Sequence, residues 1–178
     1  MVKHAWRPYE THREALRRAQ KRVEDCHYLE NLTSVDTLVA LADWMLWVIN
    51  LDDQFAVLVG QHEYERTRRV SPSSHAILGV KYAWNLTKHH SHELESVVEI
   101  TAGMQFPAQF PTVFREITWL PFERLPTVEK RFQRIKGFAE QQDAYKGFLA
   151  GRAVRHLAPA VTEHLSGLAV EPRQPAKR

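Results

Sequence analysis

Residues 34–59 read SVDTLVALADWMLWVINLDDQFAVLV, and this apolar stretch decides the fold. Ser34 is a good N-cap, so a helix is predicted from there to about Val59. At 100° per residue the apolar side chains fall into two stripes on different sides of that helix. The first is Val35, Leu38, Val39, Ala42, Met45, Leu46 and Ile49, and the second is Leu41, Trp44, Val48 and Leu51. A helix that is apolar around most of its circumference lies at the centre of a bundle or at a subunit interface. The second alternative predicts a homodimer.

Further helices are predicted on both sides of this one. Thr11-His-Arg-Glu14 has the form of a capping box and predicts a helix from there to about Leu29, with an exposed basic side. Residues 61–74 are polar and are predicted to form a loop. The remaining helices are expected over about 74–100, 128–149 and 152–165.

The pattern changes between the third and fourth predicted helices. Residues 106–111 are punctuated by proline, and residues 113–119 are β-branched and aromatic, which is typical of a short strand. The predicted fold is therefore mainly α, a bundle of four to five helices with a small extended or β insertion near residues 106–119. Residues 1–170 are expected to form a single helical domain, and residues 171–178 a disordered basic tail.

The composition limits the classes of protein to which this chain can belong. A chain of 178 residues, 44% of them hydrophobic, is long enough to bury the core of one domain, and its net charge of +3 is too small to indicate a nucleic-acid partner by itself. Cys26 is the only cysteine, which fits a reducing compartment. No apolar signal segment is present at the N-terminus, and Asp36 and Asp43 interrupt the longest apolar stretch. A cytoplasmic protein without a membrane partner is expected.

The predicted helix over 74–100 contains the segment whose side chains are best suited to catalysis or binding, Gly79 to His92. Helical periodicity gives this segment one packing side and one polar side. The polar side comprises Lys81, Trp84, Asn85, Lys88, His89 and His92. It combines cations, an amide and imidazoles.

Common cofactor and catalytic motifs do not occur in the sequence. A zinc site needs three or four convergent ligands, and there is no His-Glu-x-x-His or paired-cysteine motif, so neither a metal nor another cofactor is expected. There is no glycine-rich phosphate loop and no Gly-x-Ser-x-Gly turn. Asp52 and Asp53 offer a carboxylate pair, but two acids at a helix end are more often plain solvated residues, and they are interpreted as such.

The chemistry that remains is metal-free acid–base catalysis on RNA. An imidazole such as that of His89 can exchange a proton with a ribose 2′-OH near neutral pH, while a cation stabilises charge on the phosphate oxygens. Asn85 and His89 are i, i+4 neighbours on one helix face, and Lys81 lies one turn earlier.

Residues 83–89, Ala-Trp-Asn-Leu-Thr-Lys-His, resemble the signature of the HEPN superfamily. In these all-α domains an Arg, a polar residue that is often Asn, three variable residues and a His form a metal-independent ribonuclease site across a dimer. Asn85 and His89 match that pattern, whereas Trp84 replaces the Arg. The missing guanidinium would bind the scissile phosphate, and a lysine does not reproduce its planar fork.

The resemblance implies roles for individual residues. His89 would be the acid/base and Asn85 its positioner, in a homodimer that contacts RNA. The expected phosphate contacts are Lys81, Lys88, His92 and Arg152, the last as a substitute for the lost guanidinium. Because Trp84 replaces the Arg, weak or absent cleavage with retained RNA binding is expected.

A longer segment, residues 79–165, is similar to uncharacterised proteins of actinobacteria and their phages. The similarity rests on residues 79–85, 119–126 and 149–154. It implies a source and an architecture but no activity. The alternative function is therefore a non-catalytic protein–protein interaction protein of phage or prophage origin, acting through exposed aromatic residues such as Trp6, Trp84 or Trp119.

Overall fold

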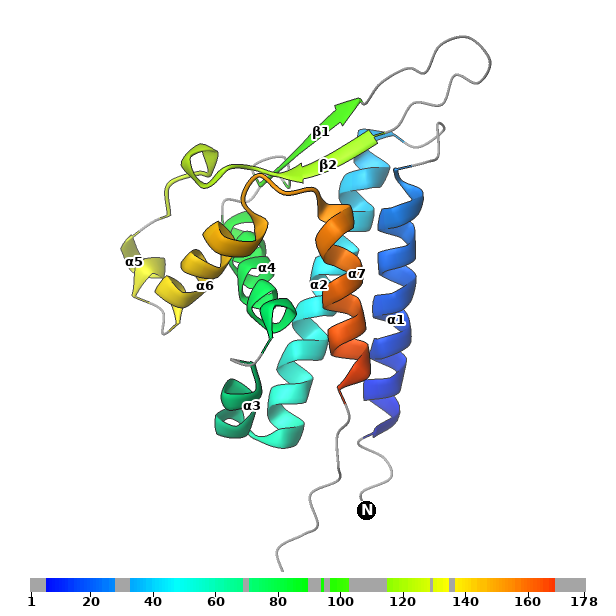
Figure 1. The fold of residues 1–178 in the computed structure, drawn as a ribbon, viewed down its shortest axis with the longest axis vertical. Helices are drawn as coiled ribbons and strands as arrows, with labels where there is room; N and C mark the ends of the chain where they lie inside the picture. The colour runs from blue at the N-terminus through cyan, green and yellow to red at the C-terminus, as the bar shows by residue number, and fades with distance from the viewer. Residues whose placement is uncertain are drawn as a thin grey trace, which may run out of the picture.

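The protein is described from a computed structural model, which describes residues 6–27, 33–68, 71–89, 94, 97–102, 115–128, 130–134 and 137–168. The fold is mainly helical with a small two-stranded antiparallel sheet, as the sequence predicts (Figure 1). The predicted tail, residues 171–178, lies outside the described residues.

Helices α1 (Trp6–Asp25) and α2 (Ser34–Val59) lie side by side (Figure 1). Helix α1 begins before Thr11, which is exposed within the helix, so the predicted capping box does not start it. The N-cap of α2 is Thr33 and not Ser34. The Thr33 hydroxyl accepts a hydrogen bond from the Asp36 N–H, and the Asp36 carboxylate accepts one from the Thr33 N–H at 2.7 Å.

Helix α2 ends at Gly60, whose φ of 91° favours glycine. Helix α3 (Gln61–Arg68) follows, in a segment where a loop was predicted. By length and composition alone α2 is a candidate membrane span, but buried core helices of soluble proteins have the same properties, and α2 packs against α1, α4 and α7. The fold is consistent with a soluble protein, and cytoplasmic location stays a prediction.

Helix α4 (Pro72–His89) ends earlier than predicted, and the segment expected to continue it contains β1 (Val98–Ala102). This strand pairs antiparallel with β2 (Arg115–Trp119), with Ile100 opposite Ile117. Strand β2 confirms the predicted strand, whereas most of the predicted insertion lies outside the described residues.

The predicted helix over 128–149 is divided into shorter pieces. Helix α5 (Lys130–Gln133) and helix α6 (Phe138–Ala144) are separated near Gly137, which has a φ of 82°. A π-helical turn, η4 (Tyr145–Leu149), continues α6, and η3 (Phe122–Arg124) is a short 3₁₀ turn before α5. Helix α7 (Val154–Gly167) matches the last predicted helix and contains Pro159.

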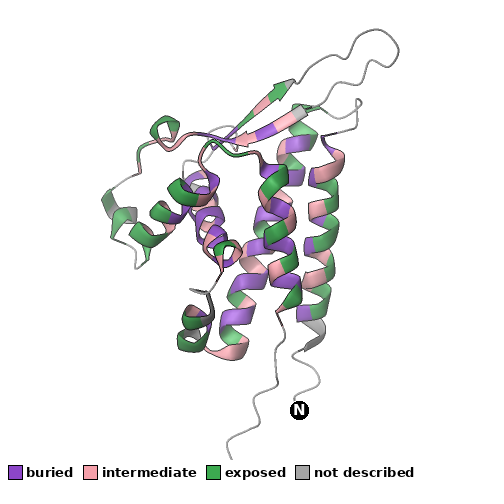
Figure 2. Cartoon of the chain, in the orientation of Figure 1, coloured by how far each residue is buried: buried purple, intermediate pink, exposed green. Residues whose placement is uncertain are grey.

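One hydrophobic core runs from Tyr9 to Leu165, and α2 lies at its centre. Figure 2 shows the buried residues gathered where α1, α2, α4 and α7 face one another. Trp44 of α2 is fully buried, and its indole N–H donates to the Thr162 hydroxyl of α7 at 3.0 Å. The packing of this core determines which sides of α2 and α4 lie near the surface.

Candidate functional site

The polar side of α4 contacts α2 through Lys81. Its Nζ lies 2.5 Å from Asp52 Oδ2 and 2.6 Å from Asp53 Oδ1, so a single ammonium group bridges two carboxylates. The Asp52 side chain is completely buried, whereas that of Asp53 is 65% exposed. The interpretation of both acids as solvated is therefore wrong for Asp52. A buried carboxylate needs a cation and hydrogen bonds to offset its lost hydration.

His164 of α7 brings a third helix to this polar cluster. Burial lowers the pKa of His164 below its ordinary value, and the negative charge of Asp52 acts in the opposite direction. Asp52 of α2 therefore interacts with Lys81 of α4 through an ion pair and with His164 of α7 through its charge. Among the described residues, no group of three or more His, Cys, Asp or Glu side chains is placed to hold a metal ion.

Asn85 lies one turn after Lys81 and contacts α6. Its Nδ2 donates to Gln141 Oε1 at 3.2 Å. Trp84 is half-buried and packs against the core. Lys81 and Asn85, the two polar residues of the predicted site whose side chains are described on α4, thus contact other parts of this chain. An RNA phosphate would have to compete with two carboxylates for Lys81.

The remaining proposed site residues near α4 are Lys88, His89 and His92. The backbone of Lys88 and His89 belongs to the helix, but their side chains lie outside the described part of the structure, as does all of His92. The roles proposed for these three residues stay predictions.

Arg152 lies away from Asn85. Gly79 approaches Tyr145 and Leu149, whereas Asn85 meets Gln141, so the α6–η4 segment runs in the opposite direction to α4. Arg152 follows Leu149, at the end of this pair remote from Asn85. It is exposed, and its guanidinium donates to the Gly147 carbonyl at 2.8 Å.

Of the three tryptophans proposed for partner binding, Trp119 is completely buried, so its proposed exposure is wrong. The side chain of Trp6 lies outside the described residues, and Trp84 is only partly accessible. The structure instead exposes aliphatic residues of α2. Val35, Val39, Leu46 and Val57 are 66%, 62%, 38% and 82% exposed. The apolar circumference of α2 was the available sequence signal for this surface.

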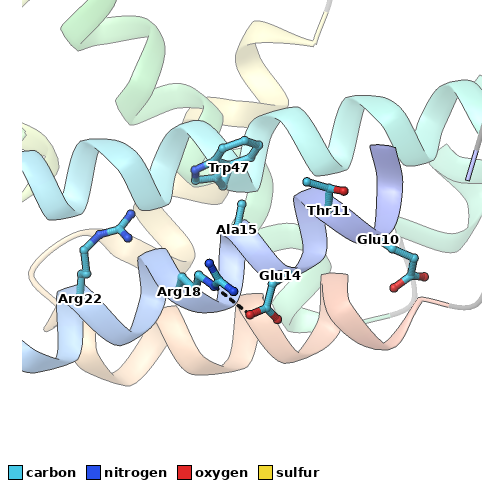
Figure 3. A pocket seen from close by; sticks show the side chains of 7 residues that line it. All are labelled: Glu10, Thr11, Glu14, Ala15, Arg18, Arg22 and Trp47. Atoms are coloured by element: carbon cyan, nitrogen blue, oxygen red, sulfur yellow. Dashed lines mark hydrogen bonds and ion pairs between the residues drawn. The ribbon is translucent and has the colours of Figure 1, made fainter. Parts of the chain in front are cut away.

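A groove of about 610 Å³ lies between α1 and α2. Figure 3 shows Trp47 of α2 facing Ala15 of α1, with Arg18 joined to Glu14 on the same helix. The groove is lined by Glu10, Thr11, Glu14, Ala15, Arg18, Arg22 and Trp47. It is open to solvent, has both charge signs at its rim and contains an aromatic ring. These properties suit a macromolecular contact better than an enclosed small-molecule site.

Comparison with known proteins finds no match to a protein-family model, a curated protein or a solved structure.

Proposed function

We propose that this protein acts by binding another protein chain and not by catalysis. The observation that supports this most directly is the exposure of four aliphatic side chains along α2. Removing such residues from water is the main driving force of protein association. A line of them on one helix is typical of helix-mediated contacts.

The polar side of α4 supports the same proposal, because its described polar side chains contact other parts of this chain and are poorly placed to bind RNA. Lys81 forms ion pairs with Asp52 and Asp53, and Asn85 donates to Gln141. A cation held between two acids is a poor phosphate ligand, because the local charge of the three groups is negative. The exposed basic residues of α1 are likewise paired, Arg18 with Glu14 and Lys21 with Asp25.

Photo-crosslinking from defined positions tests the proposal. A photoreactive residue is placed at Val39 or Val57 of the full chain, and at the exposed Glu163 of α7 as a control, in cells of the organism that encodes the protein. Protein adducts from the two α2 positions, and none from the control, are expected. The absence of adducts from α2 would overturn the proposal.

RNA binding through a degenerate HEPN-like site is the second candidate function. The observation that favours it is that Asn85 and His89 both lie within α4, one helical turn apart. The purified protein is incubated with single-stranded RNA and tRNA in EDTA, alongside His89→Ala. Binding that depends on His89 and weakens steeply with salt would favour this candidate. Cleavage that survives EDTA and disappears in the variant would establish an active ribonuclease.

A further inference from the structure

We draw no further inference here: the strongest candidate, the exposed aliphatic side of α2 with the adjoining groove against α1, carries nothing beyond the proposed function, because the charges that border it are paired within the chain and nothing in the described residues shows what covers it.

Discussion

Lys81 of α4 and Asp52 of α2 form an ion pair of 2.5 Å in which the carboxylate is completely buried. The pair joins two helices of the bundle at a point where Asp53 is a second acceptor for the same ammonium group. Lys81 itself is only 16% exposed, so water screens the interaction weakly. The geometry gives Lys81 a structural role whatever else it contacts.

Removing the cation should therefore destabilise the protein strongly. Lys81→Met leaves Asp52 buried without its ammonium partner, and we expect a loss of about 3–5 kcal/mol in the free energy of unfolding. Urea denaturation measures this value. Arg124→Met is the matched control, because Arg124 and Glu99 form an exposed ion pair at 2.8 Å whose loss should cost less than about 1 kcal/mol. Equal losses in the two variants would contradict a stabilising role for the buried pair.

The burial of Asp52 illustrates where sequence reasoning about the site failed. Helical periodicity contained a signal that distinguishes the two acids, because Asp52 lies four residues after Val48, on the buried stripe, whereas Asp53 lies on the exposed side in line with Val35. The packing of α4 against α2 shows the consequence: Asp52 is buried against Lys81 while Asp53 remains largely exposed. Lys81 and Asn85 do lie on one side of α4, as predicted from the sequence, but other elements cover part of that side. Gln141 of α6, for example, accepts a hydrogen bond from Asn85.

Prediction of the fold succeeded where a clear hydrophobic periodicity extends over many residues. Helix α2 was placed correctly, and its predicted place at the centre of the bundle is confirmed by the burial of Leu41, Trp44 and Val48. Its opposite side is exposed, and a subunit interface there stays a prediction. Helix α3 was missed because its eight residues are almost entirely polar and have no apolar period. Strand β1 was missed because a helical motif was extended through β-branched residues that pair with β2.

Stability should depend on pH through His164. Burial lowers the pKa of this imidazole in the folded state, partly offset by Asp52, so the unfolded chain binds a proton at a higher pH than the folded one. Its contribution is complete above the ordinary pKa of about 6.5 and decreases as pH falls through that value. Urea denaturation at pH 7.5 and 5.5 should show a smaller difference for His164→Gln than for the wild type. His156→Gln, at an exposed position on α7, should retain the wild-type difference.

The close approach of α4 to the π-helical turn should make Gly79 intolerant of a side chain. A Cβ at this position would lie 2.6 Å from Leu149 Cδ1 and 3.2 Å from Tyr145 Cα, and the backbone atom cannot rotate away. Gly79→Ala should lower the free energy of unfolding by about 1–3 kcal/mol, as overpacking does in other cores.

Gly147→Ala is the control for Gly79→Ala, because a Cβ at residue 147 meets no atom within 4 Å. This variant should be neutral or slightly stabilised, since alanine restricts the unfolded chain more than glycine does. Thermal unfolding followed by circular dichroism compares the two. A Gly79→Ala variant as stable as Gly147→Ala would show that α4 and η4 separate without cost.

The hydrogen bond between Trp44 and Thr162 should contribute measurably to the attachment of α7. Thr162→Val keeps the shape of the side chain but leaves the buried indole N–H without its acceptor, which should cost about 1–3 kcal/mol. In a Trp44→Phe background no indole donor remains, so the same threonine substitution should cost clearly less. Urea denaturation of the four proteins of this double-mutant cycle gives the coupling between the two residues. Thr127→Val, at an exposed position, controls for the substitution itself, and an additive cycle would mean that the bond does not stabilise the folded state.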